Sequence, residues 1–511
     1  MQIFKDYVEL IVQFKVDKNK LTAILGDAST LLRKFYEGIA NRQFKTEDDA
    51  ARALYGPQAT HADTAFRTLK KEFKKRLQQL VLLIDFSNDK SFTDFQIANY
   101  NHHKTLAVSK ILMGRAKYVA GYDLGRTMFE EATKFGITDS LLWSARYLRG
   151  HHLRRDYDEK KIAEYNAAYE QALETYYAES KALIYYENIG VYYSKSRATH
   201  KEVEPIIARY CEELDKFKEV ESPIFLLNYG MLQIFLHLST NNYRKGLEVC
   251  NLCLSKFEAK YDKFEVGLAM FLTQKQFCCT MLRQYDESLA IGLRNRTMVI
   301  KDTQNWYNNT TNLMQVYLRL ERPAEAWQLY KDAINQPNFS VQTRFTQESV
   351  HLYGAYLTWL IKVKAFAVSA EERAAAQDFR LIRYLNDVQV LDKDKRGLNV
   401  PILLLQILFY LCDTNETELE KRIENLEKYK TRYTKNDDNN RTNSLIRLMR
   451  ITLDAGFQLS IIQKNPRVPK LHQELLDTVP DYSNPSHENE FFDYGTYWTY
   501  AVRTLRKEKP F

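Results

Sequence analysis

The stretch WYNNTTNLMQVYLRLERPAEAWQLYKDAINQP, residues 306–337, decides the fold that we expect for the whole chain. Its larger side chains and its alanines recur at helical spacing: Leu313 and Tyr317 on one face, and Ala326, Tyr330 and Ala333 on another. Pro323 stands one residue into the second half, where the missing N–H of proline costs nothing. The stretch therefore predicts two short helices that are joined by a tight turn.

This order of large, aromatic and small residues resembles the tetratricopeptide repeat, a helix-turn-helix unit of about 34 residues. The match covers the Leu, the first Tyr, the Ala, the second aromatic and the second Ala of that family, while Met314 replaces its usual glycine. A single unit cannot bury both of its faces, so the resemblance implies that similar units are stacked beside it.

Five further units can be traced along the chain, at intervals of 35–44 residues. Four of these five units are anchored on a tyrosine that we expect to open the second helix: Tyr122, Tyr157, Tyr243 and Tyr285. In the unit at 306–337, Pro323 takes the corresponding place. The remaining unit is marked by its first helix, LIYYENIGVYYSKS, where Gly190 and Tyr193 stand at the Gly and Tyr places of the family.

The pattern predicts an all-α protein built as an α-solenoid of tetratricopeptide-like repeats. We divide the chain into an amino-terminal helical module (1–95), the repeat array (96–340) and a carboxy-terminal part (341–511) of degenerate repeats and capping helices. Glycine (17) and proline (11) are both below their usual shares of about 7% and 5%, which disfavours turn-dense β folds.

The amino-terminal module differs from the repeats. We expect helices at 3–15, 19–40, 46–55 and 62–84, with Thr46 as an N-cap and Gly56-Pro57 as a stop. The last of these helices has an apolar stripe of Ala65, Leu69, Phe73 and Leu77. The other side of this helix is basic, and its candidate nucleic-acid contacts are Arg67, Lys70, Lys71, Lys74 and Lys75. A solvated charged face is the simpler interpretation of that side.

Composition bounds the class of protein. The net charge of +8 permits an anionic partner without requiring one. Six cysteines in apolar helical contexts indicate a reducing compartment. Asp6 and Glu9 interrupt the first apolar run, unlike a secretory signal, and the apolar run at 401–412 is shorter than the roughly 20 residues of a membrane span. We therefore expect a cytoplasmic protein without a membrane segment.

The sequence lacks the common motifs of phosphate-binding loops, zinc proteases and serine hydrolases. Cys250, Cys253, Cys278 and Cys279 form two close pairs that could be compared with zinc ligands. Both pairs fall inside predicted helices, however, so we interpret them as core cysteines. We expect no metal, no cofactor and no enzyme activity.

The resemblance implies that the first helix of each unit lines the concave side of the solenoid and contacts a bound segment. The candidate lining residues are amides or cations: Lys110, Lys117, Arg146, Arg149, Asn188, Lys195, Gln274, Asn308, Asn312, Gln315 and Arg319. Amides can bond the backbone of an extended peptide, and arginine can bind a carboxylate.

Two functions follow. The first is a protein interaction scaffold that binds an extended segment, acidic in character, of another protein. The alternative is a regulator whose amino-terminal module binds nucleic acid or an effector domain, with the repeats as a sensor. That alternative is similar to peptide-sensing bacterial regulators at the level of architecture only.

Overall fold

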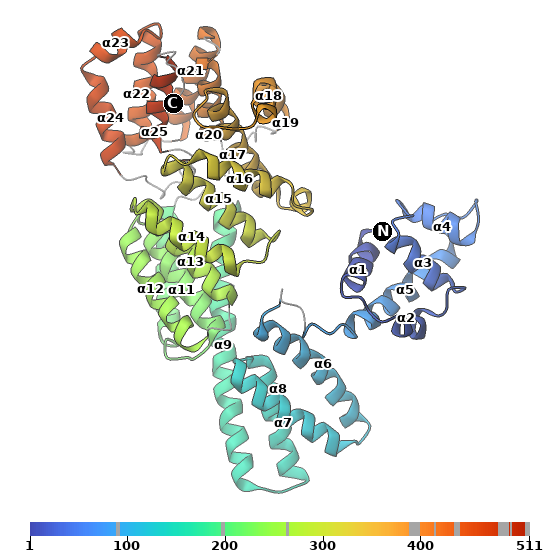
Figure 1. The fold of residues 1–511 in the computed structure, drawn as a ribbon. Coiled ribbons are helices and arrows are strands. Elements are labelled where there is room, and N and C mark those ends of the chain that lie inside the picture. Colours follow the sequence, from blue (N-terminus) through green and yellow to red (C-terminus); the bar gives the residue numbers. More distant parts are fainter. Residues whose placement is uncertain are drawn as a thin grey trace. The chain divides into compact units, whose positions relative to one another are not determined.

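The computed structural model describes residues 1–87, 92–195, 200–261, 265–387, 399–412, 415–433, 440–478, 490 and 493–505. Within these ranges it contains twenty-five α-helices, one short 3-10 helix and no strand, so the protein is all-α, as the sequence predicts (Figure 1). None of the described helices combines the length and the apolar character that a membrane crossing requires.

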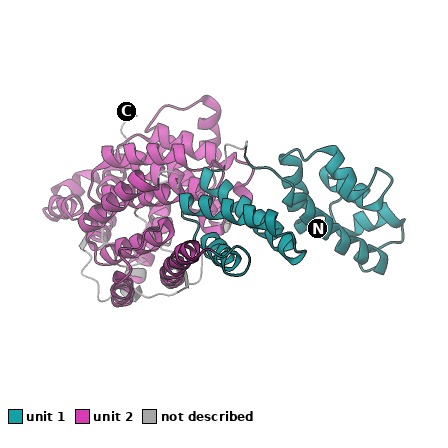
Figure 2. Cartoon of the chain, turned by 90° about the horizontal axis from the view of Figure 1, so that it is seen from below, with its two compact units in different colours: residues 1–157 teal, residues 158–511 magenta. Residues whose placement is uncertain are grey.

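The chain separates into two compact units, residues 1–157 and residues 158–511 (Figure 2). The first unit begins with five helices that enclose a core of their own: α1 (Gln2–Gln13), α2 (Lys18–Leu25), α3 (Leu31–Ala40), α4 (Glu47–Tyr55) and α5 (Thr64–Leu82). Phenylalanine rings fill this core, and those of Phe35 and Phe73 lie 4.6 Å apart between their centroids.

Two predictions for this module need correction. The single helix expected at 19–40 is two helices, because Gly26 ends α2 with a φ of 86° and the Thr30 hydroxyl accepts a hydrogen bond from the backbone N–H of Arg33 to start α3. The apolar stripe of α5 contains Phe66 in place of Ala65, which is exposed; Leu69, Phe73 and Leu77 are buried as predicted.

The remainder of the first unit is a three-helix arrangement of α6 (Asp94–Gly114), α7 (Tyr118–Phe135) and α8 (Thr138–Arg154), in which α6 also contacts α8. Gly121 and Gly125 let α7 approach Tyr147 of α8 closely. A Cβ atom at Gly125 would lie 2.6 Å from the Tyr147 ring, so only glycine fits there without a shift.

The second unit begins with consecutive antiparallel helices: α9 (Glu159–Lys195), α10 (His200–Asp215), α11 (Pro223–Leu238), α12 (Tyr243–Lys260), α13 (Glu265–Met281), α14 (Tyr285–Met298), α15 (Gln304–Arg319), α16 (Pro323–Ile334) and α17 (Arg344–Lys362). From α11 onward each helix packs against the next, and α11, α13, α15 and α17 also contact one another in succession (Figure 1). The odd-numbered helices thus form one layer, and α12, α14 and α16 each pack against two of its members.

One turn joins the two helices of four hairpins, after α6, α11, α13 and α15; the same helix ending also follows α3, at Arg42, and α17, at Lys364. In each case a residue with a left-handed φ of 55–61° follows the first helix: Ala116, Asn241, Arg283 and Glu321. The next backbone N–H donates to the carbonyl five residues earlier at 2.8–2.9 Å, which is the Schellman arrangement for ending a helix. The second helix then begins at Tyr118, Tyr243, Tyr285 or Pro323.

This turn fixes the register of the hairpins. The residue three positions into the second helix is small and buried in all four: Gly121, Gly246, Ser288 and Ala326. The equivalent of Pro323 in the first hairpin is therefore Tyr118, and the anchor that we placed at Tyr122 is one helical turn too late. The mistake arises because Gly121 and Gly125 are both small and lie four residues apart.

The interval from Tyr157 to Gly190 was also interpreted wrongly. The expected second helix after Tyr157 and the first helix LIYYENIGVYYSKS are parts of one 37-residue helix, α9. No glycine or proline occurs between Glu159 and Gly190, so nothing in that sequence supplies a turn.

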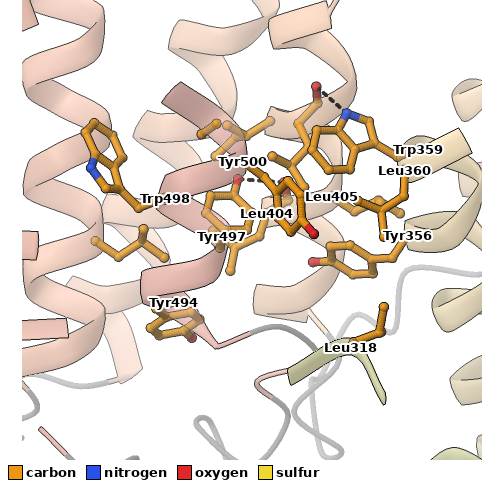
Figure 3. Packing of buried hydrophobic residues seen from close by; sticks show 14 of the residues in the cluster. Leu318, Tyr356, Trp359, Leu360, Leu404, Leu405, Tyr494, Tyr497, Trp498 and Tyr500 are labelled. Atoms are coloured by element: carbon orange, nitrogen blue, oxygen red, sulfur yellow. Dashed lines mark hydrogen bonds between the residues drawn. The ribbon is translucent and has the colours of Figure 1, made fainter. Parts of the chain in front are cut away.

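The rest of the second unit surrounds a large apolar core. Its elements are η1 (Phe339–Val341), α18 (Ala370–Asp378), α19 (Leu381–Asp387), α20 (Asn399–Cys412), α21 (Glu416–Tyr433), α22 (Asn440–Asp454), α23 (Leu459–Lys464), α24 (Arg467–Asp477) and α25 (Tyr494–Leu505). The core joins α17, α20 and α25: the Tyr497 hydroxyl donates to the Leu404 carbonyl at 2.8 Å, and Trp359 Nε1 donates to the Leu408 carbonyl at 3.1 Å (Figure 3).

Candidate functional site

Helix α15 carries four of the candidate lining residues, Asn308, Asn312, Gln315 and Arg319. Their spacing of four, three and four residues places them in one row along the helix. The helix starts at Gln304, where the Thr303 hydroxyl accepts a hydrogen bond from the Trp306 N–H, and its other faces are buried through Leu313, Val316 and Tyr317. Packing on those faces fixes the direction of the row.

The carboxy-terminal half of this row contacts a distant segment of the same chain. Gln315 Nε2 and Arg319 Nη2 both donate to the backbone carbonyl of Glu490, at 3.1 and 3.3 Å. Arg319 Nη1 also lies 4.0 Å from Oδ2 of Asp493. An amide and a guanidinium from neighbouring turns of one helix therefore share one backbone acceptor.

A third donor comes from the turn between α13 and α14. Arg283 occupies the left-handed position of that turn, and its Nη2 donates to the Thr478 carbonyl at 3.0 Å. Its Nη1 also donates to the Leu476 carbonyl. No local sequence pattern marks Arg283 as a site residue, because its acceptors lie 195 and 193 residues further along the chain.

Arg441 of α22 holds the same segment from the other side. Its guanidinium donates to both carboxylate oxygens of Glu490 at 3.1 and 2.9 Å, to Asp493 Oδ2 at 2.9 Å and to the Thr478 carbonyl at 2.6 Å. Burial alone would raise the pKa of the Asp493 carboxyl, but the charges of Arg441, Arg319 and Arg283 hold that pKa below its ordinary value. The carboxylate is thus kept ionised in a buried place.

The amino-terminal half of the α15 row contacts neither Glu490 nor Asp493, the described residues of this segment. Asn308 is exposed and accepts a hydrogen bond from Gln304 Nε2 at 2.9 Å, while Asn312 is half-buried. Gln274 in α13 stands nine residues before the left-handed residue of its turn, as Asn312 does, and is also half-buried. Asn188 is exposed on α9, and the side chain of Lys195 lies outside the described residues.

The four remaining lining candidates belong to the first unit. Lys110 stands six residues before the left-handed Ala116, as Gln315 stands before Glu321, and it is exposed. Lys117 is the N-cap of α7 and is exposed, as is Arg146 on α8, while Arg149 is half-buried. Of the ten predicted residues whose side chains the structure describes, Gln315 and Arg319 are brought onto a common acceptor.

The four cysteines of α12 and α13 are all buried, and the neighbouring Cys278 thiol together with burial raises the pKa of the Cys250 thiol. Burial raises the pKa of the Cys253 and Cys279 thiols to about 12, so both are neutral at pH 7. In the part of the chain that the structure describes, no three His, Cys, Asp or Glu side chains are grouped so that they could hold a metal ion.

The basic face of α5 is a separate candidate surface. Lys70 is paired with Glu47, with Nζ 2.5 Å from Oε2, and Glu47 also accepts from the amino terminus at 2.8 Å. These bonds to Lys70 and the amino terminus lower the pKa of the Glu47 carboxyl. The other four cations, Arg67, Lys71, Lys74 and Lys75, are exposed and form no ion pair with a carboxylate of the described residues.

Comparison with family models, with curated proteins and with solved structures gives no significant match for this chain.

Proposed function

We propose that this protein is a non-catalytic interaction scaffold, a tetratricopeptide-like α-solenoid whose inner helices bind an extended segment of another protein. The repeated turn, the small buried residue that follows it and the layer formed by α11, α13, α15 and α17 support the solenoid. In such an arrangement the odd-numbered helices face the inner side, and α13 and α15 carry five of the eleven candidate lining residues.

The observation that carries the proposal is the contact of Gln315 and Arg319 with the Glu490 carbonyl. Every residue of a peptide has a backbone carbonyl. Side chains that donate to the carbonyl of Glu490 can therefore also donate to a backbone carbonyl of a partner. Arg283 repeats the same chemistry at the preceding hairpin, where it binds two further carbonyls.

The partner segment is expected to be acidic. Lys110, Lys117 and Arg146 add exposed positive charge in the first unit, and Arg319 lies beside a carboxylate in the second. Such charges speed association with an acidic segment and favour it over a basic one.

The test is a pair of matched double variants of the full chain. Asn308→Ala with Asn312→Ala removes two amides from the proposed lining on α15. Asn251→Ala with Gln328→Ala removes two amides from exposed positions on α12 and α16. With a partner isolated from native extract, the first pair is expected to weaken binding by about tenfold or more, since each polar contact contributes about 1–1.5 kcal/mol. Equal affinities of the two pairs would contradict the proposal.

The four unpaired cations of α5 favour a second candidate function, binding of nucleic acid by the amino-terminal module. The apolar side of α5 is buried in the core of the module, so the surface offered by this helix at 67–75 is charged and polar. Four phosphate contacts predict that the logarithm of the duplex affinity falls with the logarithm of salt concentration with a slope of about −3 to −4. Binding without salt dependence, or no binding, would exclude this candidate.

A further inference from the structure

We infer that the chain carries its own ligand for α15: the segment that contains Glu490 and Asp493 occupies half of the proposed binding row and so limits the access of a partner. This inference rests on the proposed function, and it adds a regulatory contact to it. Four observations support it: the kind of contact, the charge of the segment, the extent of the contacts along the helices and the residues of the row that stay free of Glu490 and Asp493.

The first observation is the kind of contact. Glu490 is bound through its backbone carbonyl, which accepts from Gln315 at 3.1 Å and from Arg319 at 3.3 Å. These donors are two of the four side chains in the α15 row. The Glu490 carbonyl thus accepts from the same two side chains that we expect to donate to the backbone of a partner.

The second observation is charge. The same segment presents the carboxylates of Glu490 and Asp493, whose side chains are only 5% and 11% exposed. Both bond Arg441, and Asp493 lies 4.0 Å from Arg319. An acidic, backbone-bound segment is also the chemistry that we expect of the partner, so the two compete for the same groups.

The third observation is that the carboxy-terminal part contacts two successive hairpins. Arg283 lies in the turn that follows α13, and its guanidinium donates to the carbonyls of Leu476 and Thr478. Backbone carbonyls of the carboxy-terminal part are therefore held at two successive hairpins, by α15 and by the turn after α13.

The fourth observation is what remains open. Asn308 is exposed and Asn312 is half-buried, and neither contacts Glu490 or Asp493, the residues of the segment that the structure describes. A partner can first bind at these two amides and then replace the Glu490 carbonyl at Gln315 and Arg319. The segment therefore occupies only the Gln315 and Arg319 end of the α15 row, whereas a contact within a closed core would cover the whole row.

The test uses a fluorescent synthetic peptide of residues 484–496, NPSHENEFFDYGT, and the full-length chain. Glu490→Gln with Asp493→Asn removes both negative charges at constant size, and Asn at 493 retains an oxygen that can cap α25, as Asp493 does for the Gly495 N–H at 2.9 Å. The peptide is expected to bind this variant about tenfold or more tightly than the wild-type chain, because charge-assisted bonds that hold the internal segment are lost. Adding Gln315→Ala and Arg319→Ala should abolish that gain.

If the double variant keeps the thermal unfolding midpoint of the wild type and binds the peptide no better, the segment is a permanent part of the fold and the inference is wrong. If the variant is unstable, hydrogen exchange of the wild-type chain decides. The amides of residues 494–497 should exchange well before those of α11–α14, whereas exchange only on complete unfolding would overturn the inference.

The inference and the proposed function fail separately. Loss of partner binding in the Asn308→Ala, Asn312→Ala chain with no peptide binding in the charge-neutral chain would leave the scaffold and remove the internal ligand. The opposite pair of results would remove the scaffold function alone.

Discussion

Arg441 is the residue on which the carboxy-terminal part of the protein depends most. Its guanidinium is fully buried and is surrounded by two carboxylates and by backbone carbonyls. Burial lowers the pKa of an arginine, but Glu490 and Asp493 outweigh that effect and raise the pKa of Arg441. A buried ion pair adds little net stability when complete, yet it is costly to break because the remaining charges lose their partner.

Arg441→Ala is therefore expected to lower the free energy of unfolding of the second unit by about 3–5 kcal/mol. Tryptophan fluorescence during denaturation in urea measures this, since four of the five tryptophans belong to that unit. Arg450→Ala is the matched control, because Arg450 is exposed and pairs with Asp454 one helical turn away at 3.8 Å. That change should cost below about 1 kcal/mol, and equal effects of the two variants would contradict the burial argument.

Glu372 gives a prediction for the dependence of stability on pH. A hydrogen bond from Lys331, the Ser369 backbone N–H and Trp327 Nε1 lower the pKa of the Glu372 carboxyl from 4.5 to about 2. Because the folded-state pKa is the lower one, the stabilisation is complete above about pH 4.5 and is lost as the pH falls towards 2.

Glu372→Gln should therefore be less stable than the wild type at pH 7, and the difference should disappear near pH 2. Unfolding free energies measured from pH 2 to 7 test this, and an NMR titration of the Glu372 carboxyl should have its midpoint near pH 2. A midpoint near the ordinary value of 4.5 would show that the bonds to Lys331 and Trp327 do not form in solution.

At the scale of the element, the four equal turns explain how residues other than glycine can end these helices. A left-handed φ is unfavourable for a residue with a Cβ atom by about 1–2 kcal/mol, yet Ala, Asn, Arg and Glu occupy this position. The hydrogen bonds of the Schellman arrangement and the packing of the following helix offset that cost.

Ala116 allows a direct test of the turn, since its side chain is one exposed methyl group. Ala116→Gly is expected to stabilise the first unit by about 0.5–1 kcal/mol, because glycine adopts this φ without a clash. Ala116→Val should destabilise it by about 1 kcal/mol or more, because a β-branched residue is strained there. Unfolding followed by circular dichroism would contradict the assignment if the two substitutions had the same sign.

Most of the helices between 98 and 337 could be predicted from the sequence. The periodic apolar residues and the tyrosine or proline that begins the second helix of a hairpin are local features. The break at Gly26–Thr30 could also have been found, since a glycine stop and a threonine cap are both present in the sequence. The continuity of α9 was missed because the repeat period was preferred over the absence of any helix-breaking residue.

The site was predicted only where it is periodic. Gln315 and Arg319 were selected because they continue a row on one helix, and the structure gives them a shared acceptor. Arg283 and Arg441 were missed, since their roles depend on contacts with residues 34–195 positions away that no local pattern encodes.

At the scale of the whole molecule, we propose that the row of donors on α15 binds the backbone of an extended acidic segment. The segment is supplied by the chain itself at Glu490 and, by our proposal, by a partner at the open amides. In the second unit α15, which carries Asn312, belongs to the layer of α11, α13 and α17, whereas Gln328 lies on α16, which packs against that layer.

The most direct test is site-specific photo-crosslinking of the full chain to its partner. A photoreactive amino acid at position 312 on α15 should crosslink to the partner, and the crosslink should be lost when an excess of an acidic peptide is added. The same amino acid at position 328 on α16 should give none. Crosslinking from position 328 and not from position 312 would contradict the central claim that the odd-numbered helices line the binding surface.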